Sequence, residues 1–445
     1  MQKGDIRALL HGSIYSGLTP SPRAHQYPAM QVMSFALDLA QVMLSNGANS
    51  REAEVAVVAV TATWELAPLE METTADAVRL QYMPDGEAPV TEMRIIRGIT
   101  SNLTVVDRIY KLVDAIVRHG MGIDDARATL ADVEGSGARW SWGWRLLATG
   151  VLGFMLCLLA GGDLRAAPWA FALVLAVTSV AHLLERLSPP SFFLVVAQSS
   201  LGIMAGSVVL SLGWLTAAQT ATMVAPLIVL LLPHPLIVSC AQDAITGFRE
   251  PANARVLSIV LTVLGVLLGM PAGLVITQSW FHLHVDPSAI RLVPLGAVGA
   301  VIASTVAAAA NTIGQGVAAR MIPYTLVLAA LTGTLQHALT AAGFTALFAT
   351  FVSAAVLGAI CTILAYPLKT SSTVLAVPAF CGALLPSLAV ADSLLNLVGQ
   401  TPDAGLQLAT ALLSTLSIGA GLVLGSYVGT PFVKRAAARR AEGRP

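Results

Sequence analysis

The chain has 445 residues, of which 56% are hydrophobic and only 11% are charged, a composition that excludes an ordinary soluble globular protein of this length. Its formal net charge at neutral pH is zero, so the charge balance does not favour a nucleic-acid partner. The charges are unevenly placed, because residues 146–430 contain only 7 Lys and Arg and 7 Asp and Glu. Long stretches with so few charges are typical of transmembrane helices, and the charged front end predicts a water-soluble domain.

Residues 1–30 are predicted to form a flexible arm. Asp5 and Arg7 come early and no sustained apolar core follows them, so the segment does not resemble a secretory signal. The domain over residues 31–138 is therefore expected to stay in the cytosol.

This cytosolic domain is predicted to be a small α+β unit. A helix that ends at Asn46-Gly47 is followed by one capped by Ser50, with Glu52 and Glu54 in its first turn, where negative charge suits the helix dipole. Alternating residues on either side of Pro84-Asp85-Gly86 predict a hairpin. The expected elements are helices over 30–44, from Ser50, over 104–118 and over 124–134, and strands over 77–83 and 90–98.

No catalytic residue is predicted in this domain. Glu52 and Glu54 stand at a helix start, where capping accounts for both of them. His119 stands alone beside a glycine, and Arg94 and Arg97 on the second strand are expected to form a solvated face.

Ten apolar segments follow the domain, each long enough for a helix that crosses about 30 Å of hydrocarbon. The fourth and the ninth contain internal prolines, so each is a candidate broken helix. The predicted fold class is therefore a polytopic α-helical membrane protein with a small cytosolic α+β domain in front. The segments are 144–160, 167–184, 192–212, 219–241, 255–278, 292–311, 322–341, 343–365, 372–391 and 404–430.

The basic residues predict how these helices are oriented in the cytoplasmic membrane. With the soluble domain in the cytosol and ten alternating helices, the outside loops contain only Arg165 and Arg291. A basic tail over 434–445 then lies inside as well, so both termini are expected to be cytosolic. The basic residues of the inside loops are Arg139, Arg145, Arg186, Arg249, Arg255, Arg320 and Lys369.

Two pairs of matching stretches indicate an internal repeat of five plus five helices, over 139–284 and 285–433. Arg165-Ala166-Ala167-Pro168 opens the second segment, and Arg320-Met321-Ile322-Pro323 opens the seventh, 155 residues later (323 − 168). Leu231-Leu232-Pro233 matches Leu384-Leu385-Pro386, 153 residues later (386 − 233). Because each copy has an odd number of helices, the two copies must be inserted upside down relative to each other.

Inverted repeats are typical of transporters, in which the substrate binds near the bilayer midplane where corresponding helices break. The broken ends expose backbone groups that suit a zwitterion, such as an amino acid. Asp243, His234 and Asp392 are the candidates for proton coupling, because they are the titratable groups near the breaks. The predicted substrate-binding residues are Pro233, His234, Ser239, Asp243, Pro386, Ser387, Asp392 and Asn396.

Simpler interpretations of these residues stay open. Single prolines kink membrane helices without any ligand. Asp243 and Asp392 could be ordinary residues of loops at helix ends, and Gln198, Asn311 and Gln315 could bond a neighbouring helix.

The sequence predicts no metal, cofactor or enzymatic site. Cys157, Cys240, Cys361 and Cys381 all lie in apolar segments without metal-binding spacing. The motifs HExxH and GxSxG do not occur, so an intramembrane enzyme is not favoured.

Three features together resemble the threonine/serine exporter family, over residues 31–430. They are LSNGANSREAE over 44–54, RIIRGITSNLTVVDRIYKLVDAIVRHGMGIDDARATLADVE over 94–134, and five plus five helices with a doubled Leu-Leu-Pro. Three positions depart from the family pattern. Glu52 stands where the family usually has arginine, and His234 and Ser387 stand where it commonly has glycine.

The resemblance implies an exporter of threonine, serine or a similar small amino acid, driven by the proton-motive force, with protons and the lipid bilayer as its other partners. Relatives split into two shorter chains imply an alternative, the export of small dicarboxylates such as succinate. A membrane sensor or a hydrolase-like protein that uses its soluble domain is an alternative of a different class. Whether the chain forms a homo-oligomer stays open.

Overall fold

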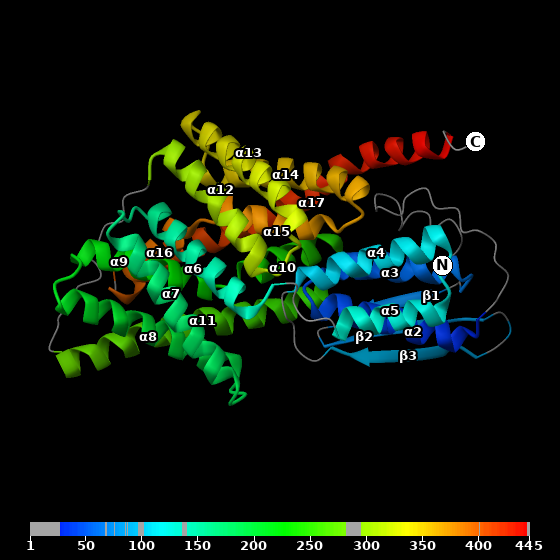
Figure 1. Ribbon diagram of the computed structural model, residues 1–445, viewed down its shortest axis with the longest axis horizontal. Helices are drawn as coiled ribbons and strands as arrows, with labels where there is room; N and C mark the ends of the chain where they lie inside the picture. Colours follow the sequence, from blue (N-terminus) through cyan, green and yellow to red (C-terminus); the bar gives the residue numbers. More distant parts are fainter. Residues whose placement is uncertain are drawn as a thin grey trace.

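Figure 1 shows a small unit of helices and strands at one end of an elongated helical bundle. We call this unit, built from α2–α5 and β1–β3, the sheet unit. Most of the predicted arm over 1–30 lies outside the described residues. The computed structural model describes residues 27–442, apart from 67–68, 75, 85, 87, 97–101, 136–139, 282–294 and 400.

The strands of the sheet unit form an antiparallel meander in the order β1, β2, β3. The predicted hairpin is confirmed as β2 (Ala77–Tyr82) and β3 (Val90–Ile95), with Ala77 opposite Ile95. The sequence prediction omits β1 (Leu69–Thr73), which pairs with β2. Its residues, LEMET, include two glutamates and bury only the first and last side chains, so the apolar alternation is weak.

Four helices complete the sheet unit, and all four lie where the sequence predicts them. α2 packs against β2 and β3, while α3 and α4 contact helices of the bundle. Gly120 ends α4 in the left-handed conformation, with φ of 66°, as a helix stop requires. The helices are α2 (Ala29–Ser45), α3 (Ser50–Thr63), α4 (Leu103–His119) and α5 (Ile123–Gly135).

The cap of α3 differs from the prediction. Asn49, rather than Ser50, is the N-cap, and its side chain accepts a hydrogen bond of 2.8 Å from the Glu52 N–H. The expectation that Ser50 caps this helix is therefore wrong. The Ser50 hydroxyl donates instead to Asp243 of the bundle, at 3.0 Å.

The bundle contains seven helices long and apolar enough to cross a membrane, or eight when α9 and α10 count as one span, among the residues described. The chain is therefore a polytopic helical membrane protein. The bundle helices are α6 (Trp142–Leu159), α7 (Ala166–Glu185), α8 (Ser191–Ser211), α9 (Ala217–Leu231), α10 (His234–Thr246), α11 (Arg249–Phe281), α12 (Ala297–Gly314), α13 (Ile322–Ala341), α14 (Ala346–Leu368), α15 (Ser372–Ala383), α16 (Ser387–Val398) and α17 (Ala404–Glu442).

The fourth and ninth predicted segments are each divided into two helices. α9 ends just before Leu232-Pro233, and α10 continues at an angle of 40° to it. α15 ends before Leu384-Leu385-Pro386, and α16 begins at the next residue. Both interruptions stand at a proline, which cannot donate the backbone hydrogen bond that a continuous helix needs.

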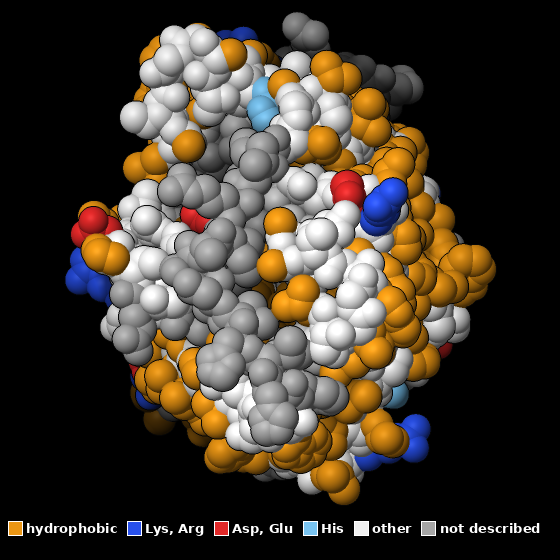
Figure 2. All heavy atoms as spheres, turned by 90° about the vertical axis from the view of Figure 1, so that its left-hand side faces the viewer, with side chains coloured by type: hydrophobic (Ala, Val, Ile, Leu, Met, Phe, Trp, Pro, Cys, Tyr) orange, Lys and Arg blue, Asp and Glu red, His pale blue; other side chains and the backbone are white. Residues whose placement is uncertain are grey.

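Large apolar side chains on the bundle surface face outward. Figure 2 looks onto the end of the bundle opposite the sheet unit, where hydrophobic side chains cover much of the rim and charged ones are few. Leu257, Val260 and Val275 along α11 are each more than half exposed. Such a surface suits contact with lipid rather than water.

Two rows of glycines bring pairs of long helices into backbone contact. Gly265, Gly269 and Gly273 of α11 lie against α8, where a Cβ at Gly273 would be 2.7 Å from the Ser200 carbonyl oxygen. The second row is Gly421, Gly425 and Gly429 of α17, which lie against α14. A Cβ at Gly429 would be 2.8 Å from the Ala359 carbonyl oxygen. Small residues four apart allow this close packing of membrane helices.

We expect Gly425→Leu to lower the thermal unfolding temperature of the purified protein in detergent. A Cβ there collides with the Ala355 carbonyl and the Ala359 N–H, so α14 and α17 must separate, and overpacking of this kind costs about 1–3 kcal/mol or more. Gly405→Leu on the same helix is the matched control, because a Cβ at Gly405 meets open space. Equal unfolding temperatures for the two variants would contradict the packing described.

Candidate functional site

Helix α4 of the sheet unit binds two cations on bundle loops. Asp107 accepts hydrogen bonds of 2.9 and 3.0 Å from Arg320, and Asp114 accepts one of 2.8 Å from Lys369. Both carboxylates are buried, whereas both cations are nearly half exposed. The N-terminus of α4 adds a backbone contact, in which the Leu103 N–H donates to the Gln315 carbonyl at 3.3 Å.

Asp243 ties helix α10 to helix α3. Its side chain is 1% exposed and accepts hydrogen bonds from the Ser50 N–H and hydroxyl, at 3.4 and 3.0 Å. Arg255 of α11 forms an ion pair with the same carboxylate. The buried charge of Asp243 is therefore paired and hydrogen-bonded, as a carboxylate removed from water requires.

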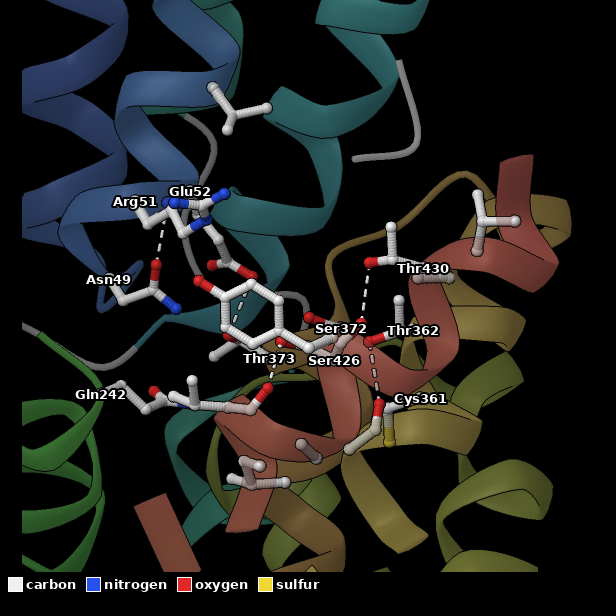
Figure 3. A pocket seen from close by; sticks show the side chains of 18 of the residues that line it. Asn49, Arg51, Glu52, Gln242, Cys361, Thr362, Ser372, Thr373, Ser426 and Thr430 are labelled. Carbon is white, nitrogen blue, oxygen red and sulfur yellow. Dashed lines mark hydrogen bonds between the residues drawn. The ribbon is translucent and has the colours of Figure 1, made fainter. Parts of the chain in front are cut away.

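A cavity of about 400 Å³ lies where the sheet unit meets the bundle, and we call it the junction cavity. Figure 3 shows Asn49, Arg51 and Glu52 approaching it from the sheet unit, opposite Thr362 and Thr430 of the bundle. Its walls come from α3, α4, α10, α14, α15 and α17. The cavity extends from the docked end of α3 to residues 358 and 422, inside the long helices α14 and α17.

The Glu52 carboxylate is held at one oxygen and unpartnered at the other. Oε1 accepts hydrogen bonds from the Ser371 hydroxyl and, at 2.9 Å, from the Thr373 hydroxyl, at the start of α15. Oε2 is buried and has no hydrogen-bond partner among the described residues. Burial raises the pKa of the Glu52 carboxyl above its ordinary value, and the hydrogen bonds from Ser371 and Thr373 oppose that rise.

Other polar groups of the junction cavity suit a ligand with more than one kind of charge. Arg51 and Lys434 supply positive charges, from α3 and from α17. The hydroxyl of Thr370, a fully buried residue, also has no partner among the described residues. The remaining hydroxyl-bearing residues of the wall are Tyr110, Thr246, Thr362, Ser372, Thr373, Ser426, Tyr427 and Thr430.

This arrangement can bind a small zwitterion. A buried carboxylate oxygen without a donor favours an ammonium group, and guanidinium or ammonium side chains favour a carboxylate. The hydroxyls can accept and donate hydrogen bonds to a polar side chain. No group of three or more His, Cys, Asp or Glu able to hold a metal ion occurs among the residues that the structure describes.

The residues predicted to bind substrate at the first helix break do not share one site in the structure. Pro233 and Ser239 line a second cavity, of about 550 Å³, together with Arg255. His234 is 3% exposed at the start of α10, and its Nε2 has no partner among the described residues. Asp243 instead bonds Ser50 and Arg255, at the docking surface of the sheet unit.

The residues predicted around the second break lie apart from that cavity. Asp392 and Asn396 are half-buried on α16, where the Asn396 amide donates to Asp392 at 3.4 Å and to Gln407 at 2.9 Å. The Ser387 side chain lies outside the described residues. Pro386 is not among the described residues that line the cavity of Pro233.

Glu52 is the residue whose position sequence reasoning missed. Capping of α3 explains a glutamate in its first turn, but the Glu52 side chain reaches the start of α15, 319 residues further along the chain. The one signal available is the stretch LSNGANSREAE over 44–54, which carries the family resemblance and contains Glu52. A separate cavity of about 230 Å³ is lined by Gln198, Asn311 and Gln315, the polar membrane residues that could, from the sequence, bond a neighbouring helix.

Long apolar helices around a polar cavity define the class as a helical membrane protein. Residues 34–277 match the family model described as "Putative threonine/serine exporter", so the chain belongs to the threonine/serine exporter family, as its resemblance implies. Family membership supports amino-acid export as its function.

Two curated relatives agree with this assignment. The chain is 28% identical over 421 residues to the "Probable threonine/serine exporter" of Mycobacterium tuberculosis, which covers 90% of this chain and 77% of that protein. It is 23% identical over 426 residues to the "Threonine/serine exporter" of Corynebacterium glutamicum, with 93% and 85% covered. No solved structure matches the chain.

We expect Asp243→Asn to loosen the docking of the sheet unit, because a neutral amide is a weaker acceptor for the two Ser50 hydrogen bonds and Arg255 beside it is left without its ion-pair partner. Removing one partner of a fully buried pair costs about 3–5 kcal/mol, and the 12% exposure of Arg255 reduces this. Amide hydrogen exchange over residues 47–54 should therefore accelerate about tenfold or more.

Glu72→Gln is the matched control for this variant. It removes the carboxylate of the Glu72–Arg79 pair on the sheet, in which both side chains are about half exposed and the pair contributes little. Unchanged exchange over 47–54 in Asp243→Asn would show that Asp243 does not fix the docking.

Proposed function

We propose that this protein is a secondary exporter that moves threonine, serine or a similar small amino acid out of the cytoplasm, driven by the proton-motive force. The observation that carries the proposal is the junction cavity. Glu52, which has one buried oxygen without a partner among the described residues, lines this cavity together with hydroxyls and two cations, and the cavity continues between helices of the membrane bundle. The printed names of both relatives support the same substrates.

The dicarboxylate alternative fits this cavity less well. A dicarboxylate would find Arg51 and Lys434, but Glu52 would repel it. A zwitterion satisfies the acidic and the basic side chains together, so we favour an amino acid over succinate.

We further propose that the bundle is an inverted repeat of five plus five membrane segments. The packing of its helices supports this proposal, because α8 packs on α11 as α14 packs on α17, and α6 packs on α7 as α12 packs on α13. The interrupted helices cross in a reciprocal way, with α9 against α16 and α10 against α15.

The two glycine rows add support for the duplication. Gly265, Gly269 and Gly273 are each followed, 156 residues later (421 − 265), by a glycine of the second row. This offset is close to the 155 and 153 residues of the two sequence matches. Each row packs against the corresponding helix of its own copy, α8 or α14. Apolar stretches that match only by chance have no reason to make the same helix contacts in both copies.

We propose that the sheet unit and the basic tail lie in the cytosol. Three basic residues assigned to inside loops from the sequence lie at the docking surface. Arg320 and Lys369 pair with carboxylates of the sheet unit, and Arg255 pairs with Asp243, which accepts hydrogen bonds from Ser50. The C-terminal part of α17 extends toward the same end of the molecule in Figure 1. These loops therefore lie on one side of the membrane, and the positive-inside rule makes that side the cytosol.

The residues near the helix breaks stay part of this proposal. In it, Pro233, His234, Ser239 and Asp243 serve the path through the first copy, and Pro386, Ser387, Asp392 and Asn396 serve the second. His234, Asp243 and Asp392 are the titratable groups that could carry the coupled proton, and no cofactor is required.

Counterflow in proteoliposomes tests the substrate and the coupling. We expect unlabelled threonine or serine loaded inside the proteoliposomes to drive uptake of labelled threonine from outside, with succinate loaded at the same concentration driving at least tenfold less. A pH gradient, acidic on the side corresponding to the cell exterior, should make threonine accumulate on that side. Equal counterflow with succinate would favour the dicarboxylate alternative, and threonine flux unaffected by the gradient would remove the proton coupling.

A further inference from the structure

We propose that the junction cavity is the cytosolic loading site of the exporter, in which the Glu52 carboxylate receives the ammonium group of the amino acid in competition with a proton. This inference rests on the proposed export of amino acids. It assigns the recognition of one end of the substrate to the sheet unit rather than to the helix breaks, and it makes loading depend on cytosolic pH.

The two oxygens of Glu52 have different surroundings. Oε1 is held by hydroxyl groups of Ser371 and Thr373, so the carboxylate cannot rotate away without losing both hydrogen bonds. Oε2 is buried and has no donor from the described residues, on a side chain that lines the cavity. A carboxylate oxygen left in this state lowers its free energy by taking either a proton or an ammonium group.

The other titratable and charged side chains among the described residues of the cavity wall do not compete with Glu52 for an ammonium group. They are Arg51 from α3, Tyr110 from α4, Cys361 from α14, and Tyr427 and Lys434 from α17. α10 contributes the neutral Gln242 and Thr246, and α15 contributes hydroxyls. Glu52 is therefore the one acidic side chain among the described residues that line this cavity.

The exchange is balanced in atoms and charge. A protonated Glu52 carboxyl loses its proton to cytosolic water, and the carboxylate that forms pairs with the substrate ammonium. Burial already favours the protonated form, because it raises the pKa of Glu52. By linkage, the free energy with which a bound ammonium group lowers the pKa of Glu52 equals the free energy with which protonation of Glu52 weakens substrate binding.

The direction of the pH effect follows from this linkage. Below the raised pKa of Glu52, each unit of falling pH should weaken substrate loading about tenfold, because the carboxylate fraction falls by that factor. Above it, loading should no longer depend on pH through this group. Acidification of the cytosol therefore slows loading, while the proton that drives export is carried elsewhere, since the sheet unit lies at one end of the bundle.

The variant Glu52→Gln tests this assignment in proteoliposomes with the sheet unit facing the L-threonine solution. We expect its KM for threonine to rise about tenfold or more, because the ammonium loses a charged partner. The KM of the unsubstituted protein should rise as pH falls through the raised pKa of Glu52, whereas the KM of Glu52→Gln should stay flat over the same range. The maximal rate and its response to the pH gradient should change little.

Glu54→Gln is the matched control, because Glu54 lies on the same helix with a pKa also raised by burial but is not among the described residues that line the cavity. It should leave the KM and its pH dependence unchanged. N-acetylthreonine, which lacks the ammonium, should compete poorly with threonine in the unsubstituted protein and almost as well as threonine in Glu52→Gln.

The outcomes separate this inference from the proposed function. If the unsubstituted protein transports no amino acid, the proposed function fails. If it transports threonine and Glu52→Gln keeps the same KM and pH dependence, the loading site is wrong while the export function stands. If Glu52→Gln does not fold, calorimetry of threonine binding to the unsubstituted protein in two buffers decides the question. If threonine binding releases a proton at low pH and releases none at higher pH, the inference is supported. If binding releases no proton at either pH, the inference is wrong.

Discussion

The docking of the sheet unit onto one end of the bundle is the constraint on which the rest of the structure depends. Asp107, Asp114 and Asp243 are all buried at this junction, and a buried carboxylate is tolerated only when it is paired and hydrogen-bonded. Asp107 and Asp114 of the sheet unit pair with Arg320 and Lys369, which follow α12 and α14. Asp243 of α10 pairs with Arg255 of α11 and accepts hydrogen bonds from Ser50, so these bundle segments must meet at the junction together. The same docking brings Glu52 to the start of α15 and forms one wall of the junction cavity.

Close packing within the bundle determines where that cavity ends. Gly358 and Leu422 line the cavity on opposite helices, and a Cβ at Gly358 would meet the Leu422 backbone. Gly421 and Gly425 keep α14 and α17 at this short distance. The polar volume therefore stops where two apolar helices meet backbone to backbone, and a substrate that enters from the sheet unit can pass further only if these helices or α10 move.

Local patterns in the sequence predict most of the fold but little of this site. Apolar length predicts the membrane helices, and the prolines at 233 and 386 predict both interruptions, because each effect acts within one helix. Helix capping equally explains Asn49 and Glu52 within one turn, so nothing local indicates that Glu52 bonds a residue 319 positions away. The glycine rows at a spacing of four are visible in the sequence, but their use as helix contacts becomes evident only when α8 and α14 are placed.

Helix α10 connects the predicted break to the junction cavity. Its first turn follows Pro233, and Asp243 in its last turn accepts hydrogen bonds from Ser50. Gln242 and Thr246, in the same part of the helix, form part of the junction cavity wall. Pro235 and Ser239, on the same short helix, line the second cavity. Because a short helix moves as a unit, rotation about the break at Pro233 would change both cavities and displace Asp243 from Ser50. The contact between Asp243 and Ser50 therefore links the position of the sheet unit to the shape of the membrane path. Asp243 is better understood as this link than as an isolated substrate ligand at the bilayer midplane.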